Sequence, residues 1–390
     1  MRTPTRLAAA GTLLFGLVAC GQGGSAQPSA PPPAGGHSTT AAHGHTAPGA
    51  ADDAALPLRA GERFVELTAA KPYTPAPPNG GTDEYRCMIV DPELAKGQYL
   101  TGVQFKPQNT AISHHTITFV VPPQDAAAIR ARDSKTPGEG WTCFGTDGLD
   151  TSTWADTWTP GVRETLLAPG LGYRMEPGSL LVLQVHYNLL TTGGRPAGSD
   201  QSSVRLRMTD GTDRTVALAT FPLTAPIELP CPPGEAGPLC DRDAAVADVH
   251  QRFGAESVEM HKGLREACGA PTPGNTQVCD YRIPAPMTVY ASRGHMHLLG
   301  RSISIERNPG TPRAEKLLDV KMFNFDDQAL HVRDEPLVLE AGDTLRVSCT
   351  HDASLRRQLP QLESLPPRYV VWGEGTADEM CLGMLTVATP

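Results

Sequence analysis

The chain has 390 residues, a net charge of −9 and no basic run, which argues against a nucleic-acid partner. Its length is too great for one compact core and suits two domains behind an N-terminal leader. Glycine (39) and proline (37) are abundant, and the apolar segments are short with turn residues between them. This pattern predicts an all-β protein rather than a helical bundle or a series of βαβ units.

The first 20 residues have the features of a targeting segment. Arg2 and Arg6 form a positive start, and Leu7 to Val18 form an apolar core that is too short to span a membrane as a mature helix. The string LVAC, which ends at Cys20, resembles a bacterial lipobox, in which the cysteine is acylated. An ordinary secretion signal with an incidental cysteine is the alternative. We expect a protein exported to the periplasmic or extracellular face of the bacterial envelope and anchored to its membrane by lipid.

Residues 21–60 contain mostly Gly, Ser, Ala, Pro and Thr, which predicts a disordered linker. The linker includes His37, His43 and His45, which either bind metal loosely or are incidental. Two β-sandwich domains are expected after it, at residues 61–212 and 213–390, with the boundary at a polar Gly/Asp turn. Within the second domain, the segment from Asp241 to Cys268 is expected to be helical or irregular.

The cysteines indicate an oxidising compartment. Without Cys20, an even number remains, which predicts four disulfides in an exported chain but leaves many connectivities open. The eight are Cys87, Cys143, Cys231, Cys240, Cys268, Cys279, Cys349 and Cys381. Nearness in sequence favours Cys231 with Cys240 and Cys268 with Cys279. No CxxC pair is present, which argues against thiolate zinc or redox chemistry.

Three strand-like segments carry histidines. In SRGHMHLLG, alternate residues of a strand share a face, so His295 and His297 project side by side with Arg293. In AISHHTITFVV, His114 and His115 are adjacent and can act jointly only at a strand end or a bulge. Paired histidines favour a metal site, because neutral imidazole is the commonest metal ligand.

The third of these segments is SLLVLQVHYNLL. It places Gln184 and His186 on one face of a strong strand pattern. A single strand histidine is more often hydrogen-bonded within a core than bound to metal. The remaining histidines of the two domains lie among polar residues without a spacing pattern; these are His250, His261, His331 and His351.

The order of these motifs resembles the copper type II, ascorbate-dependent monooxygenases, the family of the peptidylglycine alpha-hydroxylating and dopamine beta-monooxygenases. The resemblance runs from about Tyr85 to the C-terminus. It rests on DEYRCMIV, SHHTITF, VLQVHYNL, SRGHMHLLG and GEGTADEMCLGM, which follow one another in the family's order and at similar separations.

The resemblance implies two copper ions per chain. His114, His115 and His186 would hold the first, and His295, His297 and the thioether of Met380 would hold the second. The chemistry agrees, since a soft thioether selects Cu(I), whereas zinc favours three imidazoles or a carboxylate. The alternative for Met380 is a methionine that fills a gap in the core, a role that Met384 also suits.

The resemblance also implies the fold and two disulfides. The fold would be two antiparallel jelly-roll-type β-sandwiches packed side by side, each with one copper, across a solvent-filled cleft. Disulfides would join Cys87 to Cys143 and Cys349 to Cys381, and the second would hold Met380 in place. A long-range disulfide of the animal peptide-hydroxylating enzyme has no counterpart here, because Cys279 has no later partner.

The implied reaction is hydroxylation of a C–H bond. The second copper, on the catalytic residues His295, His297 and Met380, would bind O2 and abstract hydrogen, and the first would deliver an electron supplied by ascorbate. Arg293 would bind a substrate carboxylate, or else form an ion pair.

The substrate is expected to be small and organic or peptide-like. The peptide-hydroxylating relative carries Asn and Tyr near its substrate, where this chain has Leu382 and Met384. The pocket is therefore more apolar here, and the relative's substrate does not transfer. Gln184 and Tyr85 also match family positions near the cleft.

Two other functions are compatible with parts of the sequence. One is a copper-binding or copper-buffering lipoprotein without turnover, which needs the ligands but not an open cleft. The other is a jelly-roll adhesion or carbohydrate-binding module with structural histidines, which makes all six ligand matches coincidental. The sequence sets no oligomeric state.

Overall fold

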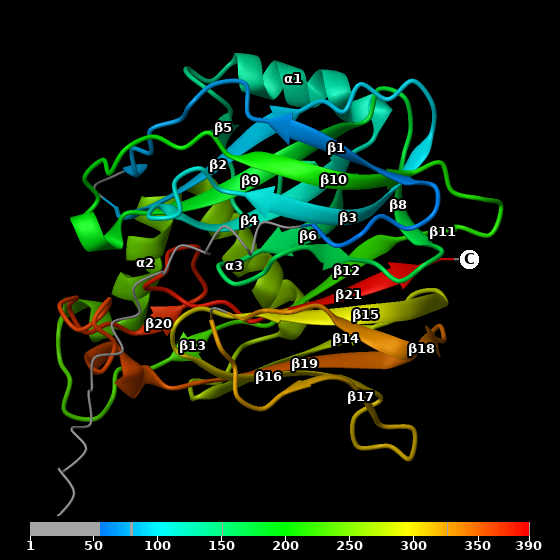
Figure 1. Ribbon diagram of the computed structural model, residues 1–390. Helices are drawn as coiled ribbons and strands as arrows, with labels where there is room; N and C mark the ends of the chain where they lie inside the picture. Colours follow the sequence, from blue (N-terminus) through cyan, green and yellow to red (C-terminus); the bar gives the residue numbers. More distant parts are fainter. Residues whose placement is uncertain (1–54, 79–80, 150, 326, 390) are drawn as a thin grey trace, which may run out of the picture. The chain divides into compact units, whose positions relative to one another are not determined.

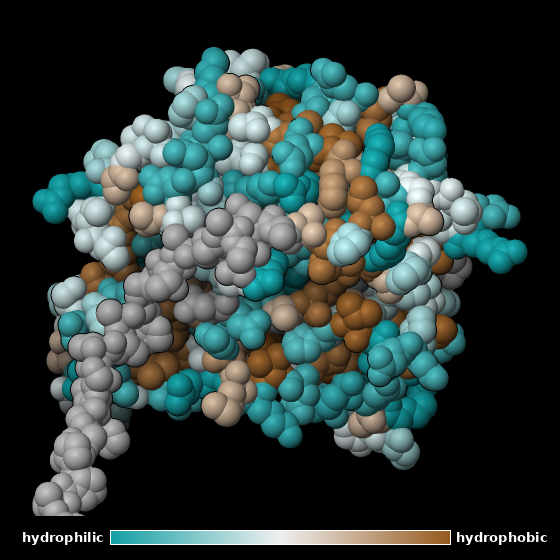
Figure 2. All heavy atoms as spheres, in the orientation of Figure 1, coloured by the Kyte–Doolittle hydropathy of each residue, from teal (hydrophilic) through white to brown (hydrophobic). Residues whose placement is uncertain are grey.

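The computed structural model describes residues 55–78, 81–149, 151–325 and 327–389. The predicted signal peptide with Cys20, the linker up to residue 54 and the three linker histidines lie outside this range. Strands dominate the described chain (Figure 1). Figure 2 shows hydrophilic side chains over much of one face, with apolar side chains gathered in patches among them.

The first sandwich consists of a six-stranded and a five-stranded sheet. All pairs are antiparallel except the parallel pair of β8 (Leu171–Met175) with β11 (Val216–Ala217). Side chains of both sheets, such as Leu206 and Leu183, share one apolar core. The six-stranded sheet contains β1 (Glu62–Thr68), β10 (Ser203–Thr209), β3 (Gln98–Lys106), β8 (Leu171–Met175), β11 (Val216–Ala217) and β7 (Thr165–Leu166). The five-stranded sheet contains β5 (Trp141–Thr142), β2 (Asp83–Val90), β9 (Leu180–Asn188), β4 (Ser113–Val121) and β6 (Thr153–Trp158).

The second sandwich consists of two four-stranded antiparallel sheets. Val289 and Leu385 from one sheet pack with Ile305 and Val347 from the other. One sheet contains β12 (Ala219–Thr224), β21 (Leu382–Ala388), β15 (Met287–His295) and β18 (His331–Leu339). The other contains β14 (Thr276–Arg282), β19 (Thr344–His351), β16 (Gly300–Arg307) and β17 (Glu315–Val320). A separate pair joins β13 (Glu228–Leu229) to β20 (Val370–Val371).

Strand β9 shows how the sequence pattern becomes a site. Its odd-numbered residues, Leu181 to Tyr187, face the main core of the first sandwich. Its even-numbered residues lie on the opposite face, where Leu180 and Val182 join a smaller apolar cluster. Gln184 and His186 follow on that same face, since side chains alternate along a strand. Because both faces are covered, nearly the whole strand is buried.

Helices occupy the connections. The segment expected to be helical or irregular forms two helices, α2 (Arg242–Phe253) and α3 (Ala255–Cys268), with Gly254 at φ 71° between them. The side chain of Asp241 caps α2 by accepting from the backbone N–H of Ala244 at 2.9 Å. The remaining helices are α1 (Ala126–Ser134), η3 (Pro123–Asp125), η4 (Leu190–Thr192), η5 (Pro238–Cys240) and η6 (Ala353–Arg357). Within the described residues, we find no helix with the length and apolar character needed to cross a bilayer.

The all-β prediction with two antiparallel sandwiches is confirmed. Sheet membership changes between β11 and β12, a few residues beyond residue 212, and the domain boundary placed there stays a prediction. All four disulfide pairings are confirmed: Cys87–Cys143, Cys231–Cys240, Cys268–Cys279 and Cys349–Cys381.

Candidate metal centre

Strands β4 and β9 bring the first three histidines together, a group that we call the first set. The register between β4 and β9 shifts between Ser113 and His115, so this end of β4 is irregular, as joint ligation by adjacent histidines requires. His115 then lies directly across from His186. All three imidazoles of the first set are buried.

The ring nitrogens of the first set face one another. Nδ1 of His186 lies 3.2 Å from Nδ1 of His114 and 3.2 Å from Nδ1 of His115. One nitrogen from each ring falls within 4.8 Å of the others. A metal ion bonded to each nitrogen at about 2.0–2.1 Å separates neighbouring ligand atoms by roughly this distance. The donor set therefore fits a metal ion.

Asp83 of β2 orients His186. Nε2 of His186 donates to Oδ1 of Asp83 at 2.9 Å, which leaves Nδ1 for a metal. Thr376 of the second sandwich donates to the same oxygen through its hydroxyl at 2.8 Å. Burial alone would raise the pKa of Asp83, but the hydrogen bonds from His186 and Thr376 hold that pKa below its usual value.

Tyr85 covers the other side of His186. The two rings stack with centroids 4.0 Å apart, and the Tyr85 hydroxyl donates to the backbone oxygen of Glu374 at 2.6 Å. Like Asp83, Tyr85 therefore joins the first set to the second sandwich. The orienting role of Asp83 was missed in the sequence, although this residue begins the DEYRCMIV motif.

We expect Asp83→Asn to lower copper affinity at the first set by about 10–100-fold, because asparagine removes the charge that supports His186. A competition titration with a Cu(I) chelator measures this affinity. Asp147→Asn is the control, since Asp147 is also buried but accepts from Ser152 and Leu149 instead. Equal losses in the two variants would contradict an orienting role.

The second set contains His295, at the end of β15, and His297, with their ring centroids 5.2 Å apart. Nδ1 of His295 donates to Oε1 of Gln328 at 2.7 Å, and Nδ1 of His297 contacts the backbone oxygen of Asp378 at 3.3 Å. Both Nε2 atoms are thus left as lone-pair donors. Nε2 of His297 is buried without a hydrogen-bond partner among the described residues, as expected of a metal ligand.

Met380 lies close to this set by its place in the chain, and its role as a ligand stays a prediction. It is buried, and it lies two residues before Leu382, which is the strand partner of His295. The next residue, Cys381, is bonded to Cys349 of β19. This disulfide anchors the end of the methionine-bearing loop to the opposite sheet.

Glu379 ties that loop to the histidines and was also missed in the sequence. Its carboxylate is fully buried and accepts from the backbone N–H groups of His297 at 2.9 Å and Leu299 at 2.6 Å. The N–H of Met380 lies 3.3 Å from the same carboxylate, and Nε2 of His351 lies 3.2 Å from it. One side chain therefore positions both the second histidine and the methionine.

The two sets lie against each other. The rings of His115 and His295 have centroids 5.4 Å apart, and all six side chains are buried. The expected solvent-filled cleft between the sites is therefore wrong for this structure. Contacts of Thr376 and Glu374 with the first sandwich close the gap. Together with the predicted thioether ligand, Met380, the five imidazoles would form a donor set that suits copper better than zinc.

The burial of these imidazoles makes stability depend on pH. Burial, followed by the neighbouring His297, lowers the pKa of His295 from 6.5 to about 3. Below pH 6.5 the unfolded chain therefore takes up a proton that the folded chain excludes, so stability falls as pH decreases.

For the metal-free protein, this one group should reduce the free energy of unfolding by about 1.4 kcal/mol between pH 7.5 and pH 5.5. Urea denaturation at the two pH values measures the loss, and His295→Gln should reduce it by that amount. His331→Gln is the control, since it replaces an exposed histidine of β18 outside both sets. An unchanged pH dependence in His295→Gln would count against the burial of a neutral imidazole.

Arg293 lies in β15 but points to the first sandwich. Its guanidinium donates to the backbone oxygen of Thr157 at 2.8 Å and lies 3.7 Å from Asp156. Burial, opposed by the charge of Asp156, lowers the pKa of Arg293. The adjoining cavity has a volume of about 20 Å³, room for roughly one water molecule. The ion pair is therefore present, and substrate binding by Arg293 stays a prediction.

Gln184 does not join either set. Its amide donates to the backbone oxygen of Thr146 at 3.2 Å and lies against the Cys87–Cys143 disulfide. It therefore packs beside the site rather than in it.

A comparison with known protein families covers the residues of the second set. The family model described as Copper type II ascorbate-dependent monooxygenase, C-terminal domain, matches residues 272–386, which include His295, His297 and Met380. No curated protein matches the sequence.

Solved structures show only weak likeness. The major capsid protein P2 from bacteriophage PM2 is 9% identical with a TM-score of 0.29, covering 83% of this chain and 97% of that one. An allantoicase is 10% identical with a TM-score of 0.19, covering 81% and 90%. These scores support no statement about function. Residues 272–386 are thus similar to the C-terminal domain of the copper type II ascorbate-dependent monooxygenases, which confirms the family resemblance for the two motifs in this range, SRGHMHLLG and GEGTADEMCLGM.

Proposed function

We propose that the protein is a copper-dependent monooxygenase that hydroxylates a C–H bond of a small organic or peptide-like substrate. It would use O2 and an external one-electron reductant such as ascorbate. The observation that carries the proposal is the convergence of the two histidine sets, with the rings of His115 and His295 5.4 Å apart. The family match of residues 272–386 supports the same chemistry.

Each set would hold one copper ion, so that the chain binds two. Bound copper would supply the activation of O2 and the one-electron transfers. The protein's own contribution is geometry: Asp83 fixes the tautomer of His186, and Gln328 fixes that of His295. Glu379 and the disulfide at Cys381 hold the methionine in place. Burial of all the ligands excludes water from the centre.

Residues beside the second set support the proposed substrate class. Leu382 and Met384 are buried strand partners of His295 and Arg293, and they add apolar surface beside this set. Arg293 supplies one cation, which would have to exchange Asp156 for a substrate carboxylate. Because the two sets are in contact in this structure, substrate entry would require the sandwiches to separate at Thr376 and Glu374.

Electron paramagnetic resonance of the copper-loaded full chain tests the proposal without a known substrate. Ascorbate should abolish the Cu(II) signal, and O2 should restore it when small aromatic and N-acyl amino acids are offered as C–H donors. O2 uptake in the same samples should depend on both ascorbate and copper. Copper-free and zinc-loaded protein are the controls. Equal O2 uptake in copper-free protein, or no reoxidation by O2, would contradict a monooxygenase.

A second candidate is a copper-binding or copper-buffering protein without turnover. The burial of all six ligands favours it, because storage needs no access for a substrate. Such a protein would bind copper and exchange electrons with ascorbate but would show no substrate-dependent O2 uptake.

We also propose that the protein is exported and anchored to the bacterial envelope by a lipid on Cys20. The LVAC string supports the anchor, and four disulfides in the described chain support an oxidising compartment. Metabolic labelling with a fatty-acid analogue tests this, since Cys20→Ala should abolish the label.

A further inference from the structure

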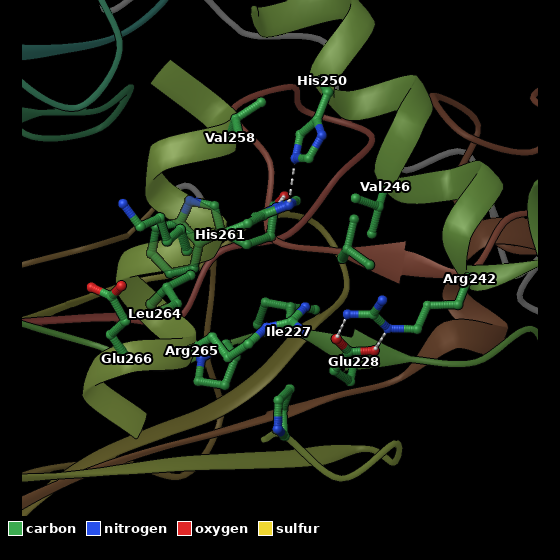
Figure 3. Close-up of a pocket in the computed structure, with 15 residues that line it drawn as sticks. Ile227, Glu228, Arg242, Val246, His250, Val258, His261, Leu264, Arg265 and Glu266 are labelled. Atoms are coloured by element: carbon green, nitrogen blue, oxygen red, sulfur yellow. Dashed lines mark hydrogen bonds and ion pairs between the residues drawn. The ribbon is translucent and has the colours of Figure 1, made fainter. Parts of the chain in front are cut away.

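A pocket of about 440 Å³ lies between helices α2 and α3 and the β13–β20 pair (Figure 3). Its walls are largely apolar and include Ile227, Val246 and Leu264. At its edge, Arg242 pairs with Glu228 at 2.5 Å and 2.7 Å, so these two charges satisfy each other. Neither residue belongs to the two histidine sets.

Two histidines from different helices meet in this pocket. Nε2 of His250, on α2, lies 3.0 Å from Nδ1 of His261, on α3 (Figure 3). The other nitrogen of His261, Nε2, donates to the backbone oxygen of Trp372 at 2.6 Å, because a carbonyl can only accept. This bond fixes the tautomer of His261, so its Nδ1 carries a lone pair directed at His250.

We propose that His250 and His261 form a third metal site, which binds a divalent transition-metal ion such as Zn²⁺ or Cu²⁺. Bonds of about 2.0–2.1 Å at angles near 90–110° place two ligand nitrogens roughly 2.9–3.4 Å apart, which includes the observed distance. A linear two-coordinate ion would need about 4 Å. The site therefore fits an ion of higher coordination number.

The surroundings agree with this assignment. Metal-ligating histidines commonly donate their second nitrogen to a backbone carbonyl, as His261 does to Trp372. Both imidazoles are only partly buried, and the pocket has room for the water molecules that would complete the coordination. The site differs from the two sets in having two protein ligands and an open side.

The test must separate a metal site from a plain histidine–histidine hydrogen bond, which the 3.0 Å distance also allows. His250→Gln does so, because a glutamine amide can still donate to Nδ1 of His261 but is a poor metal ligand. The full chain, stripped of metal, is dialysed against ZnSO4, and bound zinc is counted by elemental analysis. We expect His250→Gln and His261→Ala each to bind one zinc ion fewer than wild type.

His331→Ala is the matched control, since it removes a histidine from the exposed end of β18 and should bind as much zinc as wild type. Co²⁺ substitution adds a second readout. The visible absorption spectrum of Co²⁺-loaded wild type minus that of Co²⁺-loaded His250→Gln should show bands of a Co²⁺ ion with nitrogen ligands. If the two histidine sets bound no metal, wild type would still differ from His250→Gln by one metal ion. This test is therefore independent of the proposed monooxygenase function. Equal zinc in wild type and His250→Gln would overturn the proposal and leave a hydrogen bond.

Discussion

Met380→Ala is expected to reduce copper affinity at the second set by more than about 100-fold and to abolish ascorbate-dependent O2 uptake. Removal of groups that only orient ligands already costs 10–100-fold, so loss of a ligand itself should cost more. The thioether is also the soft donor that favours Cu(I) over harder ions. Copper per chain after desalting should fall by one ion, while the first set, built from β4 and β9, keeps its copper.

Met287→Ala provides the matched control for this prediction. Met287 and Met380 are each 6% exposed and belong to the same core cluster. Either truncation is expected to lower the free energy of unfolding by about 2–5 kcal/mol through lost packing. Only Met380→Ala should lose copper. If both variants kept full copper, Met380 would be a core residue and the second set would lack its soft ligand.

Glu379→Gln is expected to have the second large effect, on both folding stability and copper affinity. The Glu379 carboxylate accepts from the N–H groups of His297 and Leu299, and glutamine would turn one acceptor oxygen into a donor that faces them. A buried donor left unpaired costs about 1–3 kcal/mol. We expect a loss of this size in the free energy of unfolding, together with a 10–100-fold loss of copper affinity at the second set.

Denaturation with urea and competition with a Cu(I) chelator measure the two effects of Glu379→Gln. Glu374→Gln is the control in the same loop. Burial raises the pKa of Glu374 to about 8, so this carboxyl is mostly protonated at pH 7 and glutamine resembles it closely. If Glu379→Gln and Glu374→Gln behaved alike, Glu379 would have no special part in holding the loop.

Much of the fold and of the ligand set could be predicted from the local pattern of apolar, polar and turn residues along the sequence. Short alternating segments bounded by Gly and Pro turns predicted strands, and these strands were confirmed, with β19 alternating buried and half-buried residues along its length. The same alternation placed His186 on one face of β9, and the need for irregular backbone at His114 was met at the start of β4. These features depend on residues that are neighbours in the chain.

Contacts between distant residues escaped prediction. Asp83 reaches Thr376 across 293 positions, and Glu379 reaches His297 across 82. Neither carboxylate has a spacing pattern that marks its partner, because hydrogen bonds between sheets follow from packing rather than from periodicity. The pair of His250 and His261 shows the same limit: both lie among polar residues, and only the fold of α2 against α3 brings their nitrogens within 3.0 Å.

The sequence by itself therefore determined the strand content, the identity of the six ligand candidates and, through family resemblance and nearness, the four disulfides. Tertiary structure alone decided that the two ligand sets touch and that Arg293 is held by Asp156. It also decided which carboxylates hold the imidazoles. The physical reason is that side-chain alternation is a property of one strand, whereas the closing of one sandwich against the other depends on complementary surfaces that no single segment contains.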